Sequence, residues 1–136
     1  MIAVITGASS GMGREFFKKL DESENLDEIW VIARRENRLN ELKENAKTPV
    51  RVIPCDLTDE KSIKNYEELL KKENPQIKIL VNCSGYGKFG HSDVVNLEDS
   101  LGMIDLNCKA LVSVTHVTLP FMAQNSHIVQ LCSLSS

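Results

Sequence analysis

Three glycines stand close together near the start of the chain, in the segment TGASSGMG at positions 6–13. A short apolar run precedes this segment and an amphipathic run follows it, so the glycines occupy a turn between a strand and a helix. Glycine lets the backbone approach a pyrophosphate closely, and the N-terminus of the following helix attracts its negative charge. The sequence therefore predicts a nucleotide-binding turn, whereas a glycine-rich turn without a ligand is the alternative. The turn residues expected to line the nucleotide are Gly7, Ser9, Ser10, Gly11, Met12 and Gly13.

A pair of arginines follows the second apolar run. An acidic residue about twenty positions past the glycine turn would hold the ribose 2′-hydroxyl of NAD, but Ala33 occupies that place. Arg34 and Arg35 come next, and guanidinium groups bind phosphate through paired hydrogen bonds, which suits the 2′-phosphate of NADP. NADP(H) is thus the predicted cofactor in preference to NAD(H), with Arg34 as the main phosphate ligand and Arg35 as the second. The alternative is that both arginines only begin a solvated, charge-rich helix.

Short apolar runs alternate with longer amphipathic ones, which is typical of an α/β fold with helices on both faces of a parallel sheet. The predicted strands are the compact apolar runs 2–6, 28–33, 50–54, 77–82 and 127–132. Helices are expected at 13–20 and 36–45, then from a cap at Thr58 to Asn74-Pro75, and finally from a cap at Asn96 to about Met122. The last helix is apolar on more than one face, so we expect it to pack against something besides its own sheet.

Composition narrows the classes of partner. The chain has 136 residues, 42% of them hydrophobic and 26% charged, with a formal net charge of −3. These values fit one globular unit over 1–136 and offer no electrostatic case for nucleic acid. The most apolar stretch contains Asp105, Lys109 and His116, which a membrane-spanning helix tolerates poorly, so no membrane partner is expected.

The cysteines and histidines do not form a metal-binding pattern. Cys55, Cys83, Cys108 and Cys132 are widely spaced and include no Cys-x-x-Cys pair. His91 and His116 have no cysteine or carboxylate at ligand spacing, so no metal site is expected. Reduced thiols and a cytoplasmic location are the predicted state.

The spacing Thr-Gly-x-x-x-Gly-x-Gly resembles the fingerprint of the short-chain dehydrogenase/reductase family, and further segments along the whole chain fit it. Asp56-Leu57, after the third predicted strand, is similar to the family segment whose Asp hydrogen-bonds the adenine amino group. The run 82–85, after the fourth strand, is similar to the family's Asn-Asn-Ala-Gly, with Cys83 and Ser84 as departures. The resemblance implies a Rossmann-type, doubly wound sheet in the order 3-2-1-4-5. It adds as cofactor-binding residues Asp56, Leu57, Asn82, Ser84 and Gly85.

Two positions correspond to catalytic residues of the family. The helix segment MIDLN, 103–107, resembles the one that carries the family's structural and catalytic asparagine, which implies that role for Asn107. An asparagine inside an apolar helix also needs a partner or a role, although a solvent-facing asparagine is the alternative. The segment IVQLCS, 128–133, is similar to the family's Ile-Val-Asn-Ile-Ser-Ser and implies Ser133 as the serine that orients the substrate oxygen. Ser135 and Ser136 are the competing candidates.

The family's general acid/base is a tyrosine, followed in the motif Tyr-x-x-x-Lys by a lysine that lowers its pKa. The fourth residue after Tyr66 is Leu70, and the fourth after Tyr86 is Gly90, so neither tyrosine fits. The motif is expected beyond Ser136, which implies an N-terminal portion that is inactive alone. The implied function is hydride transfer between nicotinamide and a small-molecule carbonyl or alcohol substrate; a non-catalytic NADP-binding or interaction module is the alternative. The resemblance and the apolar last helix also imply a homo-oligomer.

Overall fold

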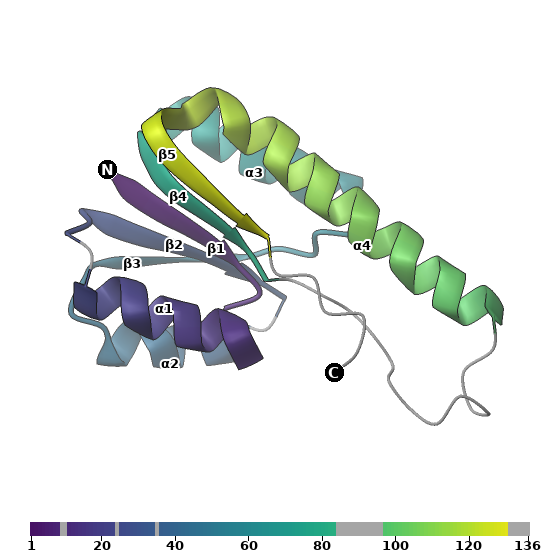
Figure 1. Cartoon of the computed structure of the whole chain (residues 1–136), viewed down its shortest axis with the longest axis horizontal. Coiled ribbons are helices and arrows are strands. Elements are labelled where there is room, and N and C mark those ends of the chain that lie inside the picture. Colours follow the sequence, from purple (N-terminus) through teal and green to yellow (C-terminus); the bar gives the residue numbers. More distant parts are fainter. Residues whose placement is uncertain (9–10, 24, 35, 84–96, 131–136) are drawn as a thin grey trace.

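A computed structural model describes residues 1–8, 11–23, 25–34, 36–83 and 97–130, apart from the side chains at 23, 99, 100 and 102–107. Strands and helices alternate along the chain (Figure 1). The elements are β1 (Ile2–Thr6), α1 (Gly11–Ser23), β2 (Glu28–Ala33), α2 (Glu36–Asn45), β3 (Val50–Pro54), α3 (Glu60–Glu73), β4 (Ile77–Asn82), α4 (Leu97–Thr118), the 3-10 turn η1 (Leu119–Phe121) and β5 (Met122–Gln130).

The five strands form one parallel sheet in the order β3-β2-β1-β4-β5, which confirms the predicted α/β class and strand order. Helices α1 and α2 cover one face, while α3 and α4 cover the other (Figure 1). β1 lies in the middle of the sheet and pairs with both β2 and β4. The chain adds β2 and β3 on one side of β1 and then β4 and β5 on the other, so the strand order reverses between β1 and β4. In open α/β sheets, ligands bind at the carboxyl ends of the strands at such a reversal.

The alternation of side chains along each strand divides the core into two clusters. In β1, Ile2 and Val4 pack on the α3/α4 side with Trp30 and Tyr66, whereas Ala3 and Ile5 pack on the α1/α2 side. All five residues of β1 are buried. A strand buried on both faces must be apolar throughout, which is why β1 and β2 appear in the sequence as unbroken apolar runs.

The predicted bounds of the first four strands agree with the structure, but those of the last strand are wrong. β5 spans Met122–Gln130 rather than beginning at His127. Asn125 has φ 63, and the pairing of β4 with β5 shifts register between Ile77 and Ile79, so the polar residues before His127 form an irregular part of the strand. β5 was expected to be buried, yet Ile128 is 39% exposed because β5 is the outermost strand of the described sheet.

The helix predictions need three changes. α1 is longer than the predicted 13–20, and α4 ends at Thr118, because Pro120 cannot continue a helix and instead forms the turn η1. Asp59, not Thr58, caps α3 by accepting a hydrogen bond from the amide of Lys61. The end of α3 agrees with the prediction, since Asn74 takes the left-handed conformation as its C-cap. The predicted cap at Asn96 lies outside the described residues.

Candidate nucleotide-binding site

The carboxyl ends of the strands are joined by backbone hydrogen bonds that continue past the strands. They run from Gly7 N to Ile32 O (2.8 Å), from Cys55 N to Ala33 O (3.0 Å) and from Cys83 N to Thr6 O (3.1 Å). The residues that follow β1, β3 and β4 are therefore held at one edge of the sheet. This edge brings the glycine turn, Arg34, Asp56 and Asn82 into one neighbourhood.

The glycine turn depends on glycine for two different physical reasons. Gly7 has φ 71 and Gly11 has φ 60, a left-handed conformation that side chains rarely adopt. A Cβ on Gly11 would meet nothing within 4 Å, so only its backbone angle requires glycine. A Cβ on Gly13 would lie 2.1 Å from the carbonyl oxygen of Gly7, so α1 can pack this closely on the turn only without a side chain there.

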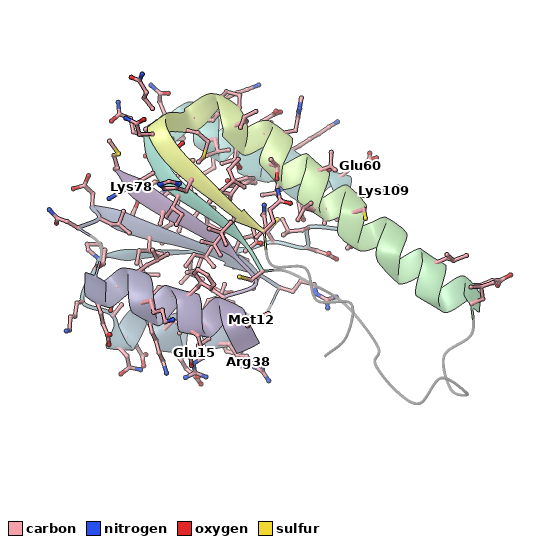
Figure 2. The ribbon with its side chains drawn as sticks, in the orientation of Figure 1. Met12, Glu15, Arg38, Glu60, Lys78 and Lys109 are labelled. Atoms are coloured by element: carbon pink, nitrogen blue, oxygen red, sulfur yellow. The ribbon has the colours of Figure 1, made fainter. Side chains whose placement is uncertain are left out.

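The N-terminus of α1 lies at the same edge as the strand ends. Figure 2 labels Met12 at this end of the helix, where its side chain is 53% exposed. The first amides of a helix lack partners within the helix and carry a partial positive charge, so this end favours an anion. Glu15 and Arg38 are labelled along the outer side of α1 and α2, and both are exposed (Figure 2).

Asp56, directly after Cys55 at the end of β3, is held by Thr58. The Thr58 hydroxyl donates to Asp56 Oδ1 at 2.6 Å, and the Thr58 amide donates to the same oxygen at 3.0 Å. Both hydrogen bonds lower the pKa of Asp56, and the bond from the hydroxyl has the larger effect. Partial burial opposes them, and the charge of Arg34 lowers the pKa further. A carboxylate near Arg34 therefore remains ionised at this edge.

Asn82, the last residue of β4, is buried and reaches toward α4. Its Nδ2 donates to Thr115 Oγ1 at 3.2 Å. This bond joins the end of β4 to the helix that carries Asn107. The neighbouring thiol of Cys83 is half-buried, and burial raises its pKa to about 11.

Tyr66 has no place in this site. It is buried between α3 and α4, where its hydroxyl lies 2.7 Å from Thr118 Oγ1. Burial raises the pKa of Tyr66 well above its ordinary value, and a hydrogen bond with Thr118 only partly offsets that. A phenol in this environment is a packing residue rather than a proton donor.

The chain matches the family model described as short chain dehydrogenase over residues 1–136. The chain belongs to the short chain dehydrogenase family. An uncharacterized oxidoreductase of Staphylococcus epidermidis is 35% identical over 136 residues, which cover 98% of this chain and 58% of that protein. The chain thus spans somewhat more than half the length of this relative.

Solved structures of the short chain dehydrogenase fold superimpose on the chain. A serine dehydrogenase complexed with NADP⁺ matches with a TM-score of 0.80 and 29% identity, over 98% of this chain and 54% of that one. A short-chain dehydrogenase from Sphingobium yanoikuyae in complex with NADPH matches with a TM-score of 0.77 and 27% identity, over 98% and 53%. These likenesses agree with the Rossmann-type sheet described above.

The structure brings together some of the short chain dehydrogenase residues predicted from the sequence. Gly7, Gly11, Met12, Gly13, Arg34, Asp56 and Asn82 lie on the elements that meet at the carboxyl edge of the sheet. The side chain of Leu57 instead packs in the core with Tyr66. Asn107 lies on α4, and nothing is described of its side chain. Outside the described residues lie Ser9, Ser10, Arg35, Ser84, Gly85 and Ser133.

Two hydroxyl groups at the site were not predicted. Thr58 was predicted to cap a helix, and no role was predicted for Thr115. The spacing Asp-x-Thr could have indicated the first, because an Asp side chain often bonds the backbone two residues later. No local pattern indicates the second, since Asn82 and Thr115 are 33 positions apart.

In the described part of the chain, no three His, Cys, Asp or Glu side chains cluster as a metal site would require. No described helix is long and apolar enough to span a bilayer.

Proposed function

We propose that residues 1–136 form one NADP(H)-binding unit of an oxidoreductase that transfers hydride between nicotinamide and a small-molecule carbonyl or alcohol carbon. The observation that carries this proposal is the contact between Gly13 and Gly7. Because Gly13 has no Cβ, the N-terminus of α1 can stand close to the end of β1, as binding a pyrophosphate requires.

The preference for NADP(H) over NAD(H) follows from the end of β2. Ala33 stands where an acid would hold the ribose 2′-hydroxyl of NAD, and Arg34 adds a positive charge beside it. The two structurally similar dehydrogenases that hold NADP⁺ and NADPH support the same choice.

Four further residues contribute to cofactor binding and catalysis. Asp56 accepts a hydrogen bond from the adenine amino group, and Asn82 secures the end of β4. When bound, the nicotinamide supplies or accepts the hydride. Ser133 orients the substrate oxygen, and Asn107 holds a water in the proton relay.

The proton donor of this reaction is not among the tyrosines of the chain. Neither Tyr66 nor Tyr86 begins a Tyr-x-x-x-Lys motif, and Tyr66 is buried away from the site. General acid catalysis typically contributes about 10²–10⁴-fold to a rate. We therefore expect the 136-residue chain alone to show no measurable reductase activity. Robust oxidation of NADPH by the purified chain with a carbonyl substrate, unaffected by Ser133→Ala, would contradict this assignment of the chemistry.

A non-catalytic NADP-binding or interaction module is the second candidate, because the glycine turn and the exposed apolar side chains of α4 could bind a nucleotide or a partner without a proton donor. The reading frame downstream of the Ser136 codon separates the two. A Tyr-x-x-x-Lys motif there supports the oxidoreductase, whereas a stop codon directly after Ser136 supports the module.

The cofactor preference is tested by titrating the chain with NADPH and NADH and following the emission of Trp30, the only tryptophan. NADPH should bind more tightly, and Arg34→Ala should weaken NADPH binding roughly tenfold or more while leaving NADH binding nearly unchanged. Arg51→Ala is the matched control, because Arg51 lies at the opposite edge of the sheet with Glu28 and Glu73. Equal affinity of the wild type for both cofactors overturns the role of Arg34.

Self-association is the proposed state in solution, while a cytoplasmic location stays a prediction. Leu97, Leu101 and Val112 of α4 are each more than half exposed, and exposed apolar patches commonly mark interaction sites. The backbone edge of β5 offers a second surface. Sedimentation at tens of micromolar should detect dimers or larger species; a monodisperse monomer would contradict the proposal.

A further inference from the structure

The hydroxyl of Thr58 donates a hydrogen bond to Asp56 rather than capping α3, the helix that follows it. Both hydrogen bonds from Thr58 reach Oδ1 of Asp56, at 2.6 Å from the hydroxyl and 3.0 Å from the amide. α3 does not need this hydroxyl, because Asp59 already caps it by accepting from Lys61 N. The Thr58 side chain is exposed, so it contributes little to the core.

The turn that carries these bonds is fixed at both ends. The amide of Asp59 donates to the carbonyl of Asp56 at 3.0 Å, which closes the turn, and the side chain of Leu57 is anchored in the core. Before Asp56, the amide of Cys55 is bonded to Ala33 at the end of β2. With the backbone fixed, the remaining freedom of Asp56 lies in its side-chain rotamer, which the Thr58 hydroxyl restrains.

We propose that Thr58 is a positioning residue for the nucleotide base: it holds Oδ1 of Asp56 and leaves Oδ2 as the acceptor for the exocyclic amino group of adenine. This inference rests on the proposed function, since it deepens the role given there to Asp56. Thr58 thereby determines selectivity for an amino-purine over a keto-purine. A keto oxygen at the same place presents lone pairs to the carboxylate and is repelled by it.

The gain comes from preparing the acceptor before the cofactor arrives. Immobilising a free side chain costs binding free energy, and an interaction made in advance within the protein removes part of that cost. The hydrogen bonds from Thr58 lower the pKa of Asp56, partial burial opposes them, and the charge of Arg34 adds to the lowering, so the acceptor is a carboxylate near neutral pH. A protonated carboxyl would lose this selectivity, because it can donate to a keto oxygen.

The test compares NADPH with its deaminated analogue, nicotinamide hypoxanthine dinucleotide phosphate, on the full 136-residue chain. Thr58→Val keeps the shape and the backbone amide but removes the hydroxyl. It should weaken NADPH binding roughly two- to tenfold and leave binding of the analogue unchanged. Thr58→Ser should restore the preference for NADPH. A merely structural role for Thr58 would lower the affinity for both cofactors equally.

Ser62→Ala is the matched control. The Ser62 hydroxyl belongs to the same segment and donates to Asp59 Oδ2 at 3.3 Å, so its loss should leave the preference for NADPH unchanged. Equal losses for both cofactors in Thr58→Val, or no loss at all, overturn the inference. A wild type that binds NADPH without preferring it to the analogue overturns the base contact but not the proposed function. A wild type that binds neither cofactor overturns both.

Discussion

The two edges of the sheet are built from different kinds of residues. At the amino edge, charged side chains satisfy one another: the Met1 amino group pairs with Asp27, and Arg51 pairs with Glu28 and Glu73. At the carboxyl edge, backbone groups and glycines meet instead, and a carboxylate and a guanidinium stand near each other without burying the helix end. We propose that the amino edge serves stability, whereas the carboxyl edge serves ligand binding.

This difference separates the expected effects of mutation. Changes at the amino edge should alter the free energy of unfolding and spare cofactor binding. Changes at the carboxyl edge should do the reverse unless they alter the packing of α1.

The largest effect is expected from Gly13→Ala. The added Cβ would stand 2.1 Å from the backbone oxygen of Gly7, and backbone cannot rotate away as a side chain can. Overpacking of this kind typically costs about 1–3 kcal/mol, and the displaced helix end should weaken NADPH binding by roughly 100-fold or more. Thermal unfolding measures the loss of stability, and titration calorimetry measures the loss of NADPH affinity.

Gly11→Ala is the control for Gly13→Ala. It introduces strain only through φ 60, because its Cβ would meet no atom within 4 Å. We expect about 1 kcal/mol of destabilisation and a smaller loss of binding. If both variants lose binding equally, close packing of α1 on the turn is not what the site requires.

Asp21 should make the stability of the amino edge depend on pH. Its carboxylate accepts hydrogen bonds from the amides of Lys47 and Thr48, at 2.7–3.0 Å. Partial burial raises the pKa of Asp21, but these hydrogen bonds outweigh it and leave the pKa below the ordinary 3.8. A lowered folded-state pKa gives stabilisation that is present above the unfolded-state pKa and is lost as the pH falls through the folded-state pKa.

Asp21→Ala should therefore cost about 1–2 kcal/mol near neutral pH and progressively less below about pH 4. Urea unfolding across this range measures the difference, and NADPH binding at neutral pH should not change. Asp27→Ala is the control, because its partner is the exposed terminal amino group. A cost that persists unchanged at the lowest pH would contradict the role of the Asp21 carboxylate.

A smaller effect is expected from Arg51→Ala. The guanidinium of Arg51 lies 5.2 Å from the centre of the Trp30 ring, and its carboxylate partners are partly exposed. Cation–π contacts and surface ion pairs each contribute about 0–1 kcal/mol, so a total loss of about 1 kcal/mol is expected. Unfolding followed by Trp30 emission measures it, and a loss of NADPH preference in this variant would show that the two edges are not independent.

The interior of the fold could be predicted from the sequence because burial dictates residue type there. β1, β2 and β4 lie between other strands, so their apolar runs mark their bounds. β5 could not be predicted in the same way. Its irregular first part contains Gln124 and Asn125, and no hydrophobic pattern indicates the left-handed backbone of Asn125.

The geometry of the candidate site could be predicted from the sequence only where a position requires one residue type. Gly13 was identified from spacing, although its reason, the approach to Gly7, is visible only in three dimensions. Thr58 has several possible partners: a hydroxyl at this point can cap a helix or bond a nearby carboxylate. Geometry chose the carboxylate because Asp59 already caps α3, and the sequence pattern contains no information on that choice.

The smallest energetic effect concerns the thiols. Their reactivity reports how well Cys55 and Cys83, at the carboxyl edge, are shielded from solvent. Burial raises the pKa of Cys55 and of Cys83 to about 11, with an interaction with Ser62 partly opposing this at Cys55. Such thiols are almost entirely protonated at pH 8, and the thiolate is the reactive form. Cys108 is exposed on α4, on the same side as Leu101 and Val112, so it serves as the internal reference at dilutions where sedimentation shows the monomer. In a Cys132→Ser background, iodoacetamide should modify Cys108 far faster than the two edge cysteines, with unfolding stability unchanged. Labelling of Cys83 as fast as Cys108 would mean that the end of β4 opens readily, and the carboxyl edge would then have to be ordered by its ligand rather than prepared for it.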